Sequence, residues 1–76
     1  MEKLLKYLVS NIVENTDDLK ISSKEENGIE VFQLKVAESD MARVIGKKGR
    51  IINSLRRLIR IKSYLLGKKT ILQLEE

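Results

Sequence analysis

The segments on either side of Asn27-Gly28 constrain the fold of this chain more than any other feature. An Asn-Gly pair favours a type I′ turn, because both central residues of that turn need a positive φ angle. A two-residue turn fixes the register of a hairpin over residues 19–36 and places its apolar side chains on one face. The facing pairs that we expect are Ser23 with Phe32, Ile21 with Leu34, and Leu19 with Val36.

Three other segments have the periodicity of amphipathic helices. Apolar residues recur every three or four positions in residues 2–14, which predicts a helix with one apolar stripe. Ser39 is expected to cap a short helix over residues 40–45, with Asp40 in its first turn. A longer helix is expected over residues 50–66. Its predicted apolar stripe consists of Ile52, Leu55, Leu58, Ile59, Leu65 and Leu66.

The alternation in residues 69–74 predicts a final strand, so the order is helix, strand, strand, helix, helix, strand. The economical packing puts all three helices on the apolar face of a three-stranded sheet, as a two-layer α+β sandwich. Two helices separate the last two strands, and such a long crossover suits a parallel pair, which makes the sheet mixed. A length of 76 residues allows one domain, residues 1–76.

Composition excludes several classes of function. The chain has neither Cys nor His, so we expect no disulfide, no metal site, no cofactor and no enzymatic activity. Its longest run of apolar residues is three, so we expect no membrane association and a cytoplasmic location.

Charge is divided unevenly along the chain. Residues 1–40 carry five Lys and nine Asp or Glu, whereas residues 41–76 carry ten Lys or Arg and only two Glu. No acid lies between Arg43 and Lys69, which favours a polyanionic partner. A solvated basic helix face is the alternative, although such faces usually mix both signs of charge.

The segment Gly46-Lys47-Lys48-Gly49 lies between the two adjacent predicted helices. Glycines permit a tight reversal, and the N-terminus of the following helix offers free N–H groups to a phosphate. A plain helical turn with solvated lysines is the simpler interpretation of this tetrapeptide. A DNA-reading helix-turn-helix is another, but those domains are usually all-helical and have no place for the hairpin.

With its flanks, residues 44–50, this segment resembles the V-I-G-x-x-G-[KR] signature of K-homology (KH) domains. The predicted element order is similar to the type II form of that fold, and the size is similar to the small bacterial KhpA type. The resemblance implies an RNA chaperone or regulatory factor that binds single-stranded RNA. It also implies a homodimer, and pairing with a larger KH-containing protein.

The resemblance implies which residues contact RNA. Lys47 and Lys48 would lie against the sugar–phosphate backbone, above an aliphatic groove, and strand residues Lys69, Thr70 and Leu72 are weaker candidates. The full set of predicted RNA-binding residues is Val44, Ile45, Gly46, Lys47, Lys48, Gly49, Arg50, Ile52, Asn53, Arg56 and Arg57.

Other residues keep two interpretations. Arg60 lies on the predicted helix with Arg56 and Arg57, and each could contact phosphate or serve solubility. Tyr64 could cover the edge of the core or lie at a partner surface. Ile51 and Ile61 fall outside the main apolar stripe and could mark a protein interface. A KH fold that acts mainly by pairing with itself or another protein therefore remains an alternative to RNA binding.

Overall fold

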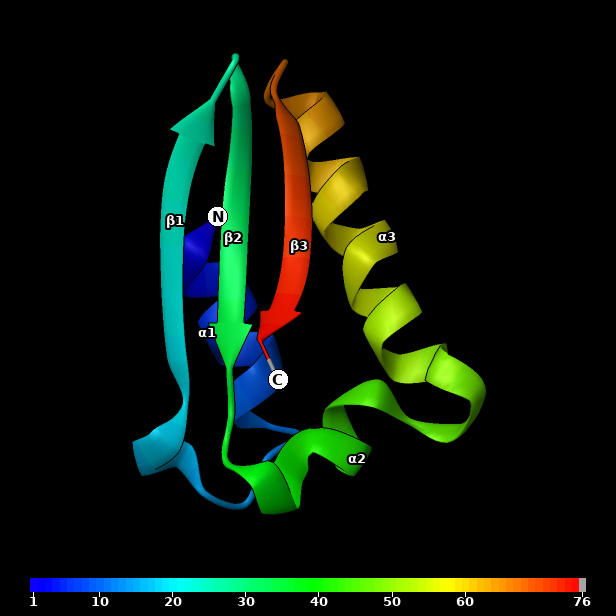
Figure 1. The fold of residues 1–76 in the computed structure, drawn as a ribbon. Coiled ribbons are helices and arrows are strands. Elements are labelled where there is room, and N and C mark those ends of the chain that lie inside the picture. Colours follow the sequence, from blue (N-terminus) through cyan, green and yellow to red (C-terminus); the bar gives the residue numbers. More distant parts are fainter. Residues whose placement is uncertain (76) are drawn as a thin grey trace.

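The computed structural model describes residues 1–75 and has the predicted element order (Figure 1). Short 3₁₀ turns lie before β1, before α2 and between α2 and α3. The helices and strands are α1 (Glu2–Ser10), β1 (Lys20–Glu26), β2 (Ile29–Lys35), α2 (Met41–Ile45), α3 (Arg50–Leu65) and β3 (Lys69–Glu75).

The sheet has the order β1-β2-β3 and is mixed: β1 pairs with β2 antiparallel, and β2 pairs with β3 parallel. Asn27 and Gly28 both have positive φ angles, as the predicted turn requires. The predicted pairs Ser23–Phe32 and Ile21–Leu34 are confirmed. The ladder ends one residue short of the third expected pair, Leu19 with Val36, although both of these side chains are buried.

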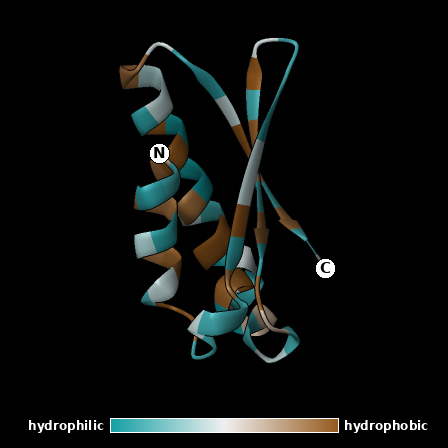
Figure 2. Cartoon of the chain, turned by 90° about the vertical axis from the view of Figure 1, so that its left-hand side faces the viewer, coloured by the Kyte–Doolittle hydropathy of each residue, from teal (hydrophilic) through white to brown (hydrophobic). Residues whose placement is uncertain are grey.

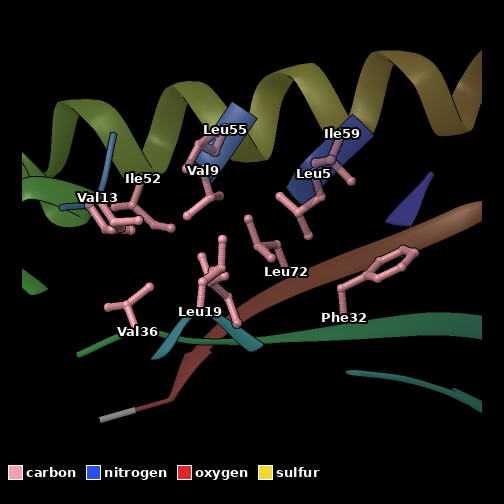
Figure 3. Packing of buried hydrophobic residues seen from close by; sticks show 12 residues of the cluster. Leu5, Val9, Val13, Leu19, Phe32, Val36, Ile52, Leu55, Ile59 and Leu72 are labelled. Atoms are coloured by element: carbon pink, nitrogen blue, oxygen red, sulfur yellow. The ribbon is translucent and has the colours of Figure 1, made fainter. Parts of the chain in front are cut away.

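The helices lie on one side of the sheet, which confirms the predicted two-layer α+β arrangement (Figure 2). The core fills the space between the layers, with α1 and α3 above the inner face of the sheet (Figure 3). Its central side chains are Leu5 and Val9 from α1, Ile52, Leu55 and Ile59 from α3, and Phe32, Leu34 and Leu72 from the sheet.

The first helix ends at Ser10, so the prediction that it extends to residue 14 was wrong. Near its end, Ser10 Oγ and Asn11 Nδ2 both donate to the Tyr7 carbonyl oxygen and compete with the helical hydrogen bond there. Ile12 and Val13 still turn inward to pack on the core. The N–H groups of Ile12 and Val13 both bond back to the Val9 carbonyl oxygen, and those of Glu14 and Asn15 bond to a residue far away in the sequence.

That residue is Asp40. The sequence analysis placed it in the first turn of a helix over residues 40–45, but α2 begins at Met41 and Asp40 precedes it. Its carboxylate is fully buried and accepts the backbone N–H groups of Glu14 (3.0 Å) and Asn15 (2.9 Å). Asn15 Nδ2 and Arg43 Nη1 donate to it as well. The two backbone N–H groups lower the pKa of Asp40 below its ordinary value, since they stabilise the charged form.

Ser39 does not cap α2, contrary to the sequence prediction. A 3₁₀ turn over Glu38–Asp40 runs directly into α2, and Ser39 Oγ accepts from Asn15 Nδ2 instead. Asp40 therefore connects the segment that follows α1 to the start of α2.

The predicted apolar stripe of α3 is only half correct. Ile52, Leu55 and Ile59 are buried, whereas Leu58, Leu65 and Leu66 are exposed. The last inward position of α3 belongs to Ser63, whose hydroxyl bonds to the Ile59 carbonyl and to Thr70 Oγ1. The inward side of α3 thus ends in a polar residue, Ser63, where the sequence pattern predicted Leu65 and Leu66.

Candidate functional site

The loop from Gly46 to Gly49 joins α2 to α3 through a sharp reversal. Gly46 has φ 75° and ψ 174°, a conformation open essentially only to glycine. A Cβ atom at Gly46 would lie 2.6 Å from Ile51 Cγ1, so the position also lacks room for a side chain. Lys48 (φ 58°) and Gly49 (φ 73°) continue the turn in the left-handed region and direct the chain into α3. Both backbone conformation and packing therefore specify this loop.

The loop presents positive charge at a helix N-terminus. Lys47, Lys48 and Arg50 are exposed, and within residues 1–75 no side chain caps the first turn of α3. The free N–H groups and the positive end of the helix dipole lie where these cations gather. This combination raises the local positive potential and suits an anion such as a phosphate.

The charges of the basic segment divide into two groups. Arg43 forms ion pairs with Glu14 (2.7 Å) and Asp40 (3.2 Å). In the part of the chain that the structure describes, none of the other nine cations between Arg43 and Lys69 has an acidic side chain within ion-pair distance. These nine exposed cations without acidic partners in that part of the chain fit a polyanionic partner and fit the alternative of a solvated basic face equally, and the salt dependence of binding separates the two.

One side of α3 runs along the outer edge of β3. Arg56 Nε donates to the Leu72 carbonyl oxygen of β3 (3.3 Å), and Arg56 Nη1 lies 3.4 Å from Asn53 Oδ1. These contacts hold two of the predicted RNA-binding side chains beside the strand. Arg57, the next residue, and Arg60, one turn further along the helix, are both exposed.

The aliphatic residues of the predicted site lie deeper than the groove floor that the resemblance implied. Val44 has no exposed surface and Ile52 only 6%. Both belong to the core, and Ile45 is partly buried against it. Val44 and Ile52 therefore pack in the core next to the loop, and Ile45 is the one aliphatic residue of this set that is partly exposed.

Sequence reasoning gave Ile51 no role beside the loop, yet its side chain covers Gly46. No spacing signal marks this contact, because it depends on the backbone angles of the loop.

In residues 1–75 there is no cluster of three or more acidic side chains that could hold a metal ion. None of the described helices has both the length and the apolarity needed to cross a membrane.

The chain has the element order αββααβ, and a GXXG loop joins its second and third helices. These are the features of a type II KH domain. The sequence model of the family described as "KhpA/KhpB, KH domain" matches residues 2–74. The chain belongs to the KhpA/KhpB family of KH domains.

Three relatives illustrate the similarity. "RNA-binding protein KhpA" of Listeria monocytogenes is 36% identical over 69 residues, which cover 91% of this chain and 86% of that protein. The protein of the same name from Clostridium acetobutylicum is 30% identical over 97% of this chain and 99% of its own length. The one from Treponema pallidum is 36% identical over 76% of this chain and 72% of its own.

Proposed function

We propose that this protein binds single-stranded RNA in the cytoplasm, without catalysis, as an RNA chaperone or regulatory factor. The observation that carries the proposal is the pair of exposed lysines in a GXXG loop at the uncapped N-terminus of α3. The family match and the names of the relatives support it.

The RNA backbone would lie on the Gly46–Gly49 loop, with phosphates near Lys47, Lys48 and Arg50. Neighbouring bases would lie between α3 and the edge of β3, beside Asn53 and Arg56. Arg57 would lie within reach of the same RNA. Because only unpaired bases can lie between the side of α3 and the edge of β3, single-stranded RNA should bind better than a duplex of equal length. Tighter binding of duplex DNA in competition would instead support a helix-turn-helix mode.

The direct test reverses the charge of the loop. Lys47→Asp with Lys48→Asp should remove most affinity for single-stranded RNA, because it places two negative charges against the phosphates. Both side chains are exposed, so unfolding free energy should change by less than about 1 kcal/mol. The matched control is Lys3→Asp with Lys6→Asp on the exposed side of α1, which should bind as the parent does.

Fluorescence anisotropy with labelled RNA measures both variants, and circular dichroism verifies folding. Unchanged affinity in the folded loop variant would contradict the proposal.

A second function, self-association, is favoured by another surface of α3. We define an outward seam as Leu58, Ile61 and Leu65, which are exposed, together with Ile51, which is exposed at the loop end of α3 and also covers Gly46. Their spacings of seven, three and four residues are those of a helix–helix contact. A second copy of α3 related by a two-fold axis would cover this seam with the same residues, as an isologous interface requires. The basic residues Arg57 and Lys62 flank it, and no acid lies beside them on the helix.

A homodimer through the outward seam therefore brings like charges together, and added salt should strengthen it while weakening RNA binding. Leu58→Asp should give a monomer in light scattering and retain RNA binding. A larger KH-containing partner with acidic flanks would show the opposite salt dependence. A parent protein that stays monomeric at all salt concentrations would contradict the homodimer.

A further inference from the structure

A hollow lies at the end of α3 opposite to the loop, between the last turns of that helix and the start of β3. It has a volume of about 380 Å³. The residues that shape it are Arg60, Tyr64, Lys68, Lys69 and Ile71, together with Ser63 at its inner end. No acidic side chain of the described chain lines it.

Tyr64 forms an aromatic wall of this hollow. Its side chain is 82% exposed, so core packing does not account for it, and the suggestion that it covers the edge of the core is wrong. Ile71, also exposed, adds an apolar surface from β3. The hydroxyl of Ser63 is already engaged by Ile59 and Thr70, so the inner end of the hollow has no unmet hydrogen bond at this residue.

Three cations surround this aromatic and apolar surface. Arg60, Lys68 and Lys69 have no acidic partner within ion-pair distance in residues 1–75. An aromatic face beside unpaired cations is the combination that binds a nucleotide of a single strand, with the base stacked and its phosphate neutralised.

The hollow is connected to the loop by the side of α3 that follows β3. Fifteen residues separate Gly49 from Tyr64, which corresponds to about 22 Å along the helix axis. Asn53 and Arg56 lie between the two ends, on the same side. A strand held at the loop can therefore reach the hollow without crossing the outward seam.

We propose that this hollow is a second nucleotide subsite, in which an unpaired base stacks on Tyr64 and Arg60 and Lys69 bind the adjacent phosphate. The inference rests on the proposed RNA-binding function and adds a site at the other end of α3 from the loop. A GXXG loop clamps about four nucleotides, so the hollow serves a nucleotide further along the strand. Short RNAs would fill only the loop end.

The test compares RNAs of about four nucleotides with RNAs of roughly twice that length. Tyr64→Ala should weaken binding of the longer RNA at least about five-fold, since stacking contributes ~1–3 kcal/mol per base. It should leave the short RNA unchanged. Tyr64→Phe should bind both as the parent does, because it keeps the ring. Tyr7→Ala, which removes an exposed tyrosine from α1, is the matched control and should have no effect.

A direct readout uses Tyr64→Trp in a chain that otherwise has no Trp. The longer RNA should quench the fluorescence of this variant, and the short one should not. If Lys47→Asp with Lys48→Asp abolishes binding but Tyr64→Ala affects neither RNA, the subsite is wrong and the proposed function stands. If the loop variant binds normally, the proposed function itself fails. If an acidic peptide quenches the introduced tryptophan and the longer RNA does not, the hollow is a protein site and the subsite is overturned.

Discussion

The two ends of α2 treat charge in opposite ways, although only five residues separate them. At the start, the buried carboxylate of Asp40 is surrounded by donors from Glu14, Asn15 and Arg43. At the end, Lys47 and Lys48 are exposed, and no acid in residues 1–75 pairs with them.

This difference separates charges that stabilise the fold from charges that are available to a partner. Removing a donor or acceptor from the Asp40 cluster leaves a buried polar group unsatisfied, which is costly. Removing a loop lysine leaves nothing unsatisfied. We therefore expect the two ends of α2 to respond differently to salt, substitution and acid.

Salt should produce the largest contrast. If Lys47, Lys48, Arg50 and one arginine of α3 each neutralise a phosphate, log K against log salt should have a slope of about −3 for single-stranded RNA. Affinity should then fall roughly fifty-fold between about 50 and 200 mM salt. The melting temperature should change little over the same range, because the Asp40 cluster is buried.

Titrations at several salt concentrations measure this slope. Lys48→Ala should make it shallower by about 0.7, whereas Lys3→Ala should leave it unchanged. A slope near zero in the parent would make the basic segment a solvated face and would give priority to self-association.

The loop backbone should be the next most sensitive feature. Gly46→Ala introduces a Cβ atom 2.6 Å from Ile51 and forces an unfavourable φ angle, so it should destabilise the protein by at least about 2 kcal/mol. Gly28→Ala is the control, because Gly28 also has a positive φ angle but has open space around it. It should cost only about 1 kcal/mol. Equal losses in urea denaturation would mean that the contact with Ile51 does not constrain the loop.

Acid should act at the other end of α2. Hydrogen bonds lower the pKa of Asp40, so its contribution to stability is fully present above the ordinary aspartate pKa, about 3.9. That contribution is lost as the pH falls through the lowered value. Asp40→Asn should therefore melt several degrees below the parent at neutral pH, and the difference should shrink in acid.

Asp17→Asn, at an exposed position, is the control and should follow the parent at every pH. A difference between parent and Asp40→Asn that stays constant with pH would show that the charge of Asp40 does not stabilise the fold.

The sequence predicted the hairpin well because local chemistry determines it. Asn27-Gly28 sets the turn, and the turn sets the pairing of Ser23 with Phe32. The sequence also predicted the position of the Gly46–Gly49 loop, because its glycines and lysines are visible without any tertiary contact. Whether the candidate residues bind RNA is a prediction that the experiments above address.

Most of the errors in the sequence analysis involve tertiary contacts. The segment that follows α1 is held by Asp40, which accepts the backbone N–H of Glu14 from far along the chain. The periodicity of α3 contains two apolar stripes, and only packing against the sheet decides that Ile59 is buried while Leu58 is exposed. Tyr64 had no resolved role in the sequence because the hollow it lines depends on β3.

The smallest expected effect concerns the helix dipole and compares the two ends of α3. A cation near a helix N-terminus is unfavourable, whereas one near the C-terminus is favourable, by roughly 0.3–1 kcal/mol each. Lys48 precedes the first turn of α3, and Lys62 lies in its last turn. Lys48→Ala should therefore raise the unfolding free energy by about 0.3 kcal/mol at low salt, and Lys62→Ala should lower it by a similar amount. Both changes should vanish in high salt. Urea denaturation of the two variants measures the signs. A loss of stability in Lys48→Ala would show that this lysine supports the fold, and the contrast between the two ends of α2 would no longer hold.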